Sequence, residues 1–573
     1  MNTKTPNFII AAGGTGMRCL QSFLNICALG MYTGETIDIL LLETDIENGD
    51  KKNSENLVSW YRTLQTGKSG NHEYFGPQVN FHTFVPDYSK DNKRRFTLIS
   101  RVEEGDSETN RMLVDLFYEE GVQEFDLMHG FRAQTHVGTY LMYHAIVEEI
   151  REAVEKDIVR NKSELYQFIN KIKESNNGGE ARVFLLGSTF GGTGASSIPV
   201  MARAITDSAK IITGGVINME NIYFGAVILT PYIKFKSPSK EHKKAEKVIA
   251  DSQFFAHNSA AALMYYIKDN TIQDTYKRFY MVGWPFGSLD MDQYRERVAG
   301  GKASGKTITG GKSQENPAHP NELLAAFAAQ DFLMDTTKEW FKETHSTEVR
   351  FKAIEYDTDQ KNEKVAYFNF DDFISDTASK PKNNGEEAGQ KPVDAGRDLK
   401  RSEVFARNIT GMYFFTLLLQ DSYGGDLQAF LNNLARYNYR YTLTSEEAEA
   451  FNRFAQYFSY QRDEKSIKPG YVPQMFYSLR DPKRGEFLNY HPSTLDVLSM
   501  MAETPTTDFG RAMLLDEFAS AGGRKHADIF VSAWCRQNKP RKKGDRGEFF
   551  ADLRKTLSAF TPHSWMVENK ESK

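Results

Sequence analysis

The 573-residue chain contains only three cysteines, Cys19, Cys27 and Cys535, and no two of them form a CxxC pair. This spacing indicates neither a zinc site nor a disulfide framework. The twelve histidines are scattered along the chain without the HExxH spacing of a catalytic zinc site. The sequence therefore provides no recognisable ligand set for a structural or catalytic zinc ion.

Long hydrophobic runs are also lacking. No window reaches the 18 or more apolar residues that a membrane-spanning helix needs, and residues 1–6 lack the apolar region of a signal peptide. The formal net charge of −5 gives no general attraction to nucleic acid or to an anionic membrane. The basic run of residues 539–543 is more typical of a solvated loop. We therefore expect a cytoplasmic protein without a membrane or nucleic-acid partner.

Hydrophobic residues make up 40% of the chain, and in its first half they follow two alternating patterns. Apolar, β-rich runs occur at residues 8–12, 36–42, 182–186, 222–230 and 278–283, with helical patterns at 17–29, 108–119, 139–153 and 241–255. Alternation of this kind predicts the α/β class, with a Rossmann-like, mostly parallel sheet flanked by helices. Ligands of such sheets bind at the carboxyl ends of the strands.

Changes in composition predict three regions. Residues 1–320 form the expected α/β domain, in which 299–320 read as a flexible loop rich in Gly, Lys and Ser. A long central helix is expected over 321–345, because apolar positions cover much of its surface. Residues 346–573 are expected to form a mainly helical C-terminal domain, with a polar, disordered loop near 376–400.

Two glycine-rich turns follow expected strands, Gly13-Gly14-Thr15-Gly16 and Gly191-Gly192-Thr193-Gly194. Glycine allows the backbone to approach a ligand closely, and a helix N-terminus presents free N–H groups with a partial positive charge. The segment Glu43-Thr44-Asp45 also ends an expected strand. Phosphate held from two sides, with acidic groups nearby, is the ligand that this combination favours.

A third glycine-rich segment, Gly300–Thr307, formally matches the P-loop pattern GxxxxGK[ST]. That pattern needs a buried strand before it and a helix after it. Polar residues precede this segment, and a Gly- and Lys-rich stretch follows it. We interpret it as a flexible basic loop whose lysines could close over a bound phosphate.

The two glycine turns resemble those of the tubulin/FtsZ superfamily. Gly191–Ser196 is similar to its phosphate loop, although Ser196 stands where the family has a glycine, and Gly13–Gly16 takes the place of its first loop. Leu42-Glu43-Thr44-Asp45 resembles the acidic strand end, and Gly130–Gly138 loosely resembles the third loop. Leu229-Thr230-Pro231-Tyr232, Asn258 and Asn321 follow in the order of the family. Over roughly residues 6–345, the chain is thus similar to divergent bacterial tubulin-like proteins.

This resemblance implies GTP and Mg²⁺ as cofactors. Glu43 and Asp45 would hold Mg²⁺ through its bound water, as that ion prefers, and Arg132 would contact the γ-phosphate. The amides of Asn258 and Asn321 would read guanine, since an amide can both accept and donate hydrogen bonds. The implied nucleotide-binding residues are Gly13, Gly14, Thr15, Gly16, Arg18, Thr44, Arg132, Ser188, Gly191, Gly192, Thr193, Gly194, Ala195, Ser196, Asn258 and Asn321.

The family also hydrolyses GTP between subunits that associate head to tail into filaments. The best match to its catalytic loop is Asn369–Asp376, with Asp371, Asp372 and Asp376 as candidate catalytic acids. One acid is displaced, because Ile374 occupies the expected position. The resemblance therefore favours nucleotide binding over hydrolysis, and it implies a homo-oligomer or filament.

Two alternatives remain. The protein could be a nucleotide-gated scaffold or sensor, in a defence setting for example, that does not hydrolyse GTP and recruits a partner protein through its C-terminal domain. It could also be a Rossmann oxidoreductase, although Gly14–Cys19 lacks the last glycine of GxGxxG. That last alternative leaves Gly191–Gly194 without a role.

Overall fold

The structure is a computed structural model, and it describes residues 5–66, 74–86, 107–118, 130–131, 133–235, 250–284, 289–290, 316–334, 348–353, 401–463, 466–477, 523–538 and 541–559. The chain divides into two compact units. The first comprises Met1–Asn25, Thr33–Gly70 and Pro77–Phe351, and the second comprises Ile26–Tyr32, Asn71–Gly76 and Lys352–Lys573. Each unit is considered on its own below.

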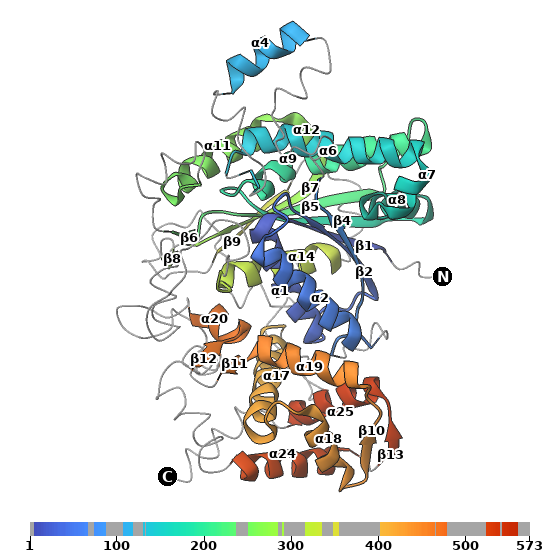
Figure 1. The fold of residues 1–573 in the computed structure, drawn as a ribbon, viewed down its shortest axis with the longest axis vertical. Helices are drawn as coiled ribbons and strands as arrows, with labels where there is room; N and C mark the ends of the chain where they lie inside the picture. The colour runs from blue at the N-terminus through green and yellow to red at the C-terminus, as the bar shows by residue number, and fades with distance from the viewer. Residues whose placement is uncertain are drawn as a thin grey trace, which may run out of the picture. The chain divides into compact units, whose positions relative to one another are not determined.

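The first unit is built on a seven-stranded sheet with the order β3-β2-β1-β4-β5-β7-β9 (Figure 1). Six neighbouring strands of this sheet, in the spatial order β3, β2, β1, β4, β5 and β7, pair in parallel. The strands are β1 (Asn7–Ala12), β2 (Thr36–Leu42), β3 (Gln78–Phe84), β4 (Ala181–Ser188), β5 (Ile222–Leu229), β7 (Tyr276–Gly283) and β9 (Glu348–Ala353). The α/β class with a Rossmann-like parallel sheet is thereby confirmed.

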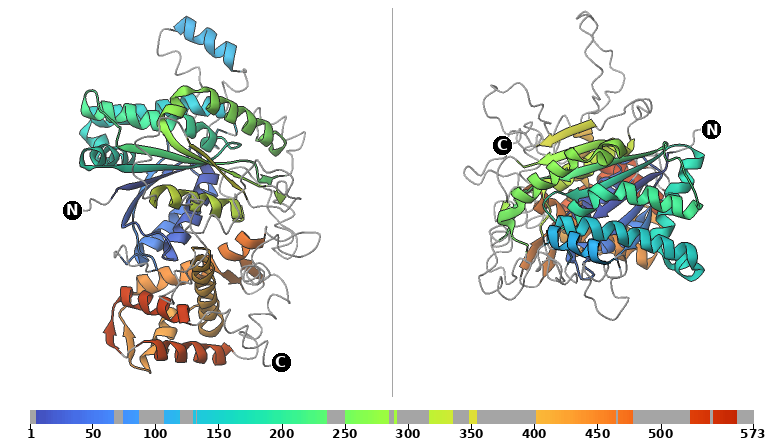
Figure 2. Two further views of the ribbon diagram at one scale, coloured as in Figure 1. Left: turned by 180° about the vertical axis from the view of Figure 1, so that it is seen from behind. Right: turned by 90° about the horizontal axis from the view of Figure 1, so that it is seen from above.

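Helices cover both faces of this sheet (Figures 1 and 2). One face carries α1 (Gly13–Ala28), α2 (Gly49–Leu64) and α14 (Pro320–Met334). The other carries α6 (Thr135–Glu155), α7 (Asp157–Lys162), α8 (Glu164–Gly178), α9 (Thr193–Thr213), α11 (Phe255–Lys268) and α12 (Asn270–Thr275). Strands β1, β4 and β5 are buried along their whole length. Strands buried on both faces read as continuous apolar runs, which is why the sequence revealed them.

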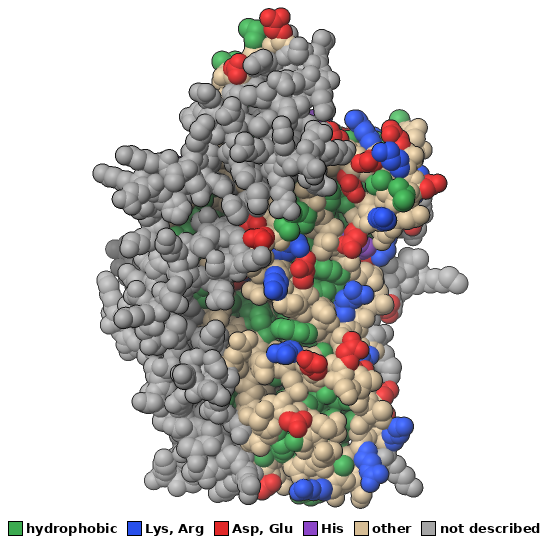
Figure 3. Space-filling view, viewed as in Figure 1, with side chains coloured by type: hydrophobic (Ala, Val, Ile, Leu, Met, Phe, Trp, Pro, Cys, Tyr) green, Lys and Arg blue, Asp and Glu red, His purple; other side chains and the backbone are tan. Residues whose placement is uncertain are grey.

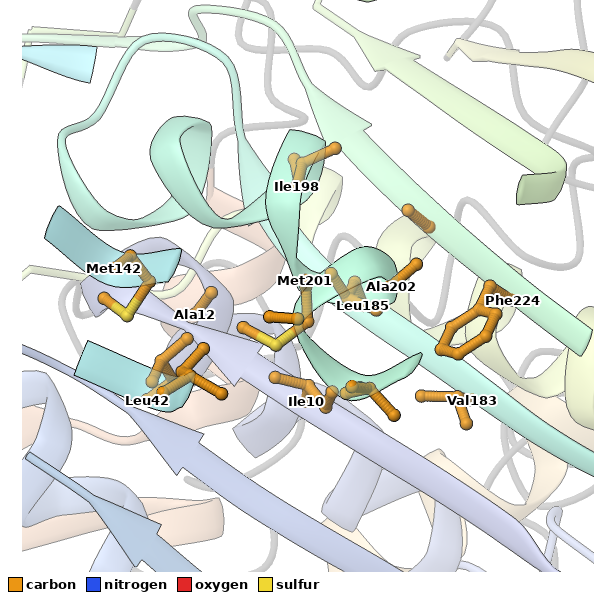
Figure 4. Packing of buried hydrophobic residues seen from close by; sticks show 14 of the residues in the cluster. Ile10, Ala12, Leu42, Met142, Val183, Leu185, Ile198, Met201, Ala202 and Phe224 are labelled. Carbon is orange, nitrogen blue, oxygen red and sulfur yellow. The ribbon is translucent and has the colours of Figure 1, made fainter. Parts of the chain in front are cut away.

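The core between the sheet and helices α6 and α9 is shown in Figure 4. Ile10 of β1 and Leu185 of β4 point toward Ile198 and Met201 of α9, while Met142 of α6 closes the same layer. All five side chains are at most 1% exposed. Burying an aliphatic side chain of this size contributes roughly 1.5–3 kcal/mol each, so this layer fixes the strand ends from which the loops emerge.

Helix α14 packs against the opposite face of the sheet. Its residues are almost all buried, consistent with the apolar positions on most of its surface. A Cβ atom at Gly225 of β5 would lie 2.7 Å from the ring of Phe332, so only glycine lets this helix approach the sheet. The expected helix over 321–345 is described as far as Met334, and residues 335–347 lie outside the described residues.

The second unit contains the helices and short strands of the C-terminal half. The helices are α17 (Arg401–Tyr423), α18 (Leu427–Ala435), α19 (Ser445–Phe458), α20 (Tyr471–Tyr477), α24 (Gly523–Gln537) and α25 (Arg546–Ala559). Strands β10 (Tyr439–Tyr441) and β13 (Arg541–Gly544) pair, as do β11 (Tyr460–Asp463) and β12 (Ser466–Pro469). Phe430, Trp534 and Phe549 belong to its aromatic core. The mainly helical C-terminal domain stays a prediction, since residues 354–400, 478–522 and 560–573 are not described.

The other predicted strands and helices agree with the structure only in part. All five predicted strands are present, with bounds that differ by two residues or fewer at either end. The helical pattern over 108–119 corresponds to α4 (Ser107–Phe117), whereas most of the one over 241–255 lies outside the described residues. Strand β3 was not predicted, because its polar and apolar residues alternate at the sheet edge. Within the described ranges, no helix has both the length and the apolar character needed to cross a bilayer.

The described surface carries charges of both signs. On the face shown in Figure 3, Lys and Arg side chains lie interspersed with Asp and Glu, and neither sign gathers into a patch. A basic surface that could bind nucleic acid electrostatically is therefore not seen among the described residues of that face.

Candidate functional site

A cavity lies where strands β1 and β4 end. Connections from β1 lead toward β2 and β3, and those from β4 lead toward β5 and β7, so the strand order reverses between these two neighbours. Ligands of open α/β sheets bind outside the carboxyl ends of the strands at this switch point. The cavity has a volume of about 110 Å³. It is lined by Ala12, Gly13, Gly14, Thr15, Arg18, Glu43, Asp45, Asn48, Gly130, Phe131, Ala133, Ser188, Phe190, Gly191, Gly192, Thr193, Gly194, Ile233, Phe235, Ala250, Phe255 and Asn316.

The two glycine turns approach each other within this cavity. Gly13 has φ +71°, and a Cβ atom there would lie 3.1 Å from the backbone nitrogen of Gly194. A Cβ atom at Gly194 would in turn lie 3.0 Å from the nitrogen of Ser188. Side chains at either position would separate the turns, so glycine is needed here for close backbone contact. A Gly194→Val substitution would therefore disturb the fold as well as any ligand.

Both glycine segments contain helix starts that favour an anion, since α1 begins at Gly13 and α9 at Thr193. Helix α9 begins at Thr193, and its N-cap residue, Gly192, supplies no side-chain hydrogen bond to the first turn. Neither α1 nor α9 has an acidic residue in its first turn. N–H groups at a helix start and the positive end of its dipole attract phosphate and carboxylate groups. The glycine side of the cavity is thus suited to an anionic ligand.

Glu43 directly follows β2 and lines the cavity. Its Oε1 atom accepts a hydrogen bond from the Thr193 hydroxyl at 3.0 Å and from the Thr44 backbone N–H at 2.8 Å, and Oε2 accepts from Asn48 Nδ2 at 3.3 Å. Burial raises the pKa of Glu43 to about 7, although these donors oppose the shift and the nearby Asp45 adds to it. A cation beside this carboxyl would favour its ionised form.

The donor set on this side fits a hydrated magnesium ion. Glu43 and Asp45 both line the cavity and are each 2% exposed. Mg²⁺ commonly binds one or two carboxylates together with water and substrate phosphates. No group of three or more His, Cys, Asp and Glu residues within the described ranges could hold a metal by itself. Two carboxylates could hold such an ion only if water or a ligand's oxygens supplied its remaining positions.

Arg18 lines the cavity and belongs to a buried polar network. Its guanidinium pairs with Glu322 at 2.7 Å and with Asp50 at 3.1 Å, and it donates to the Tyr232 hydroxyl at 2.7 Å. The Asp50 pKa is raised to about 6 by burial, against the attraction of Arg18. His319 contacts the Tyr232 ring, and burial lowers its pKa well below the ordinary value. Arg18 is the only Lys or Arg among the residues described as lining the cavity, and two carboxylates already compensate its charge.

Aromatic side chains form the remaining side of the cavity. The ring centroids of Phe190 and Phe255 are 5.0 Å apart, and those of Phe235 and Phe255 are 6.1 Å apart. Phe190 follows β4, Phe235 follows the short strand β6 (Ile233–Lys234) and Phe255 begins α11. We call these three residues the aromatic wall. Phe131 and Ile233 also contribute apolar side chains to the cavity lining.

The structure brings most of the expected site residues together. Those that line the cavity are Gly13, Gly14, Thr15, Arg18, Ser188, Gly191, Gly192, Thr193 and Gly194, along with the expected metal ligands Glu43 and Asp45. Those that do not are Gly16, Thr44, Ala195, Ser196, Asn258 and Asn321. Arg132, Asp371, Asp372 and Asp376 lie outside the described residues.

Several expected residues that do not line the cavity have a packing role beside it. A Cβ atom at Gly16 would overlap the carbonyl oxygen of Leu186, so this glycine holds α1 against β4. The Ser196 hydroxyl donates to the Thr135 carbonyl at 3.0 Å and thereby joins α9 to the start of α6. The Thr44 hydroxyl lies 3.3 Å from that of Thr193. These contacts support the cavity without forming its surface.

The two asparagines expected at a base lie elsewhere. Asn258 is half-buried on α11. Asn321 is fully buried at the start of α14, and neither polar atom of its side chain has a hydrogen-bond partner. Neither residue lines the cavity. Their role in reading guanine stays a prediction.

Sequence reasoning missed the aromatic wall, Asn48 and Asn316. Asn48 carried a local signal, because it caps α2 by accepting a hydrogen bond from the Lys51 backbone N–H at 3.1 Å. The aromatic residues come from three separate segments that the fold brings together, and single aromatic residues are usually core. No periodicity could have linked them.

Comparison of the chain with models of protein families and with curated proteins finds no match. The interpretation of the site therefore depends on its geometry and chemistry.

Proposed function

We propose that this protein binds GTP together with Mg²⁺ in the cavity at the ends of β1 and β4, as a tubulin-like protein would. The observation that carries the proposal is the pair of glycine turns at the switch point of the sheet. Gly13 and Gly194 come close enough to exclude side chains, and the uncapped start of α9 adds donors for phosphate oxygens. The turns would hold the phosphates, and Glu43 and Asp45 the metal.

The cavity size is consistent with this division of the ligand. Its volume of about 110 Å³ is below the roughly 300–1,000 Å³ of pockets that enclose whole drug-sized ligands. Phosphate groups would lie against the glycine turns, and the nucleoside would extend along the rest of the lining. A pocket with backbone donors on one side and acids on the other suits a metal–phosphate complex better than a neutral ligand.

The charges of the lining make the metal essential in this proposal. Glu43 and Asp45 would repel a triphosphate, and the charge of Arg18 is already compensated by Glu322 and Asp50. Mg²⁺ would join the carboxylates to the phosphate oxygens. We expect GTP to bind with Mg²⁺ and to lose affinity when the ion is chelated.

Isothermal titration of GTP, ATP and NAD, each with Mg²⁺ and with EDTA, tests the proposal. Gly191→Val is the informative variant, because a Cβ atom there meets only the Ser188 hydroxyl, at 3.2 Å, so that a side chain would enter the cavity. Gly215→Val is its matched control, since nothing lies within 4 Å of a Cβ atom at Gly215. GTP binding that Gly191→Val abolishes and Gly215→Val retains would support the proposal. Absence of nucleotide binding by the wild type, or NAD binding alone, would overturn it.

Hydrolysis and assembly are further parts of the proposal that the resemblance implies. Positioned water and electrostatic stabilisation by backbone N–H groups would carry hydrolysis, with Mg²⁺ supplying charge stabilisation when bound. Replacing Asp371, Asp372 and Asp376 together by Ala should lower phosphate release if they act, and sedimentation with GTP should show head-to-tail assembly. Unchanged turnover would remove this segment as the catalytic loop, and binding without turnover would favour the scaffold or sensor alternative.

A further inference from the structure

The phenyl rings of the aromatic wall offer no hydrogen-bond donors to phosphates, yet they line the same cavity as the glycine turns. Phe190, Phe235 and Phe255 come from three segments that meet only in the folded first unit. Phe190 and Phe255 are 3% and 5% exposed, whereas Phe235 is partly exposed. Phe235 is thus the member whose ring is most accessible to a ligand.

The backbone around Phe235 is held in place. Its N–H donates to the Ser252 hydroxyl at 3.0 Å, and its carbonyl accepts from the same hydroxyl at 2.9 Å. The Phe235 ring meets Phe255 edge-on, with an interplanar angle of 90°. A ring fixed in this way loses little freedom when another flat group packs against it.

Hydrogen-bonding groups able to read a base are scarce on this side of the cavity. Asn258 and Asn321 do not line it, and Arg18 is engaged by Glu322, Asp50 and Tyr232. Asn316 Nδ2 donates to Asp50 at 3.5 Å, and the Asn316 Oδ1 atom is buried without a hydrogen-bond partner among the described residues. Besides this one acceptor, ring faces are a contact that the lining offers to a heterocycle.

We infer that the aromatic wall binds the purine base of the nucleotide by ring contact, with Phe235 as its principal residue. This inference rests on the proposed function, because it assumes that the phosphates occupy the glycine side. Every base has a π-face, and removing one aromatic partner of a stacked base costs about 1–3 kcal/mol, or roughly fivefold to 150-fold in affinity. The wall thereby distinguishes a nucleotide from inorganic polyphosphate.

Binding of GTP and of inorganic tripolyphosphate, both with Mg²⁺, separates the two halves of the ligand. Phe235→Ala should weaken GTP binding about tenfold and leave tripolyphosphate binding unchanged. Phe235→Trp should retain GTP affinity, and the introduced indole fluorescence should be quenched by GTP but not by tripolyphosphate. Phe254→Ala is the matched control, because Phe254 is 55% exposed beside the wall and does not line the cavity.

The outcomes distinguish this inference from the proposed function. Equal GTP affinity in Phe235→Ala and wild type would overturn the inference and leave the phosphate site standing. Equal loss of GTP and tripolyphosphate in Phe235→Ala would also overturn it, because the residue would then act on the whole site. Failure of the wild type to bind either ligand would instead overturn the proposed function.

Discussion

The Thr193 hydroxyl donates a hydrogen bond of 3.0 Å to Oε1 of Glu43, across 150 positions of the sequence. This bond connects the first residue of α9 with the end of β2. The glycine turn and the acidic strand end are therefore one structural site. A ligand that displaces either residue will therefore also affect the position of the other.

The first prediction concerns this hydrogen bond. Thr193→Val keeps the shape of the side chain and removes the donor, whereas Thr193→Ser keeps the donor. Hydrogen bonds to charged groups contribute about 1.5–3 kcal/mol, so Thr193→Val should weaken Mg²⁺-dependent nucleotide binding by roughly tenfold or more, and Thr193→Ser should not. Titration calorimetry would measure both affinities. Equal affinities in the two variants would show that the hydroxyl is dispensable.

The second prediction is a pH dependence of stability that originates at Glu43. Its pKa is raised by burial from 4.5 to about 7, so the folded state binds a proton that the unfolded state has released between these values. The stability that this group contributes is therefore complete below about pH 4.5 and falls as the pH rises to about 7. Glu43→Gln cannot ionise. We compare the free energies of unfolding of this variant and of wild type without nucleotide or Mg²⁺. The difference, variant minus wild type, should be larger at pH 8 than at pH 5 by on the order of 1–3 kcal/mol.

Urea denaturation of both proteins at pH 5 and pH 8 measures this difference. Asp50, with a pKa raised to about 6, titrates in both proteins and so cancels in the comparison. A stability difference between wild type and Glu43→Gln that does not change with pH would contradict the prediction.

The third prediction concerns the buried network around Arg18. Arg18→Met would leave Glu322 and Asp50 without the cation that pairs with both of them. Removing one partner of a buried ion pair costs about 3–5 kcal/mol. The cost should be smaller at pH 5 than at pH 8, because protonation of Asp50, whose pKa burial raises to about 6, removes one uncompensated charge.

The shift of the urea midpoint at each pH provides the measurement. The double variant Arg18→Met/Asp50→Asn serves as a control, since it removes one of the two stranded carboxyls and should recover part of the loss. Identical losses at both pH values would show that packing, rather than charge, sets the effect.

The fourth prediction separates packing from binding at Gly16. A methyl group at this position would overlap the carbonyl oxygen of Leu186, and backbone cannot move aside cheaply. Gly16→Ala should therefore lower stability by about 1–3 kcal/mol, typical of overpacking. Gly215→Ala, with open space around it, should have little effect. Equal thermal midpoints for the two variants would remove the packing role of Gly16.

Local sequence determined the strands and the loops of the site. The apolar runs of β1, β4 and β5 predicted buried parallel strands, because each must be covered on both faces. The glycines of Gly13–Gly16 and Gly191–Gly194 predicted two turns at strand ends, which the structure brings into one cavity. These features depend on neighbouring residues, and a sequence displays them directly.

Only the tertiary structure determined which distant residues contact one another and which of them line the cavity. It joined Thr193 to Glu43, compensated Arg18 with Glu322 and Asp50, and assembled Phe190, Phe235 and Phe255 into one wall. In the tertiary structure, Gly16 has a packing role, and neither Asn258 nor Asn321 lines the cavity. The physical reason is that burial and pairing depend on residues brought together by the sheet order, and those residues have no fixed spacing along the chain.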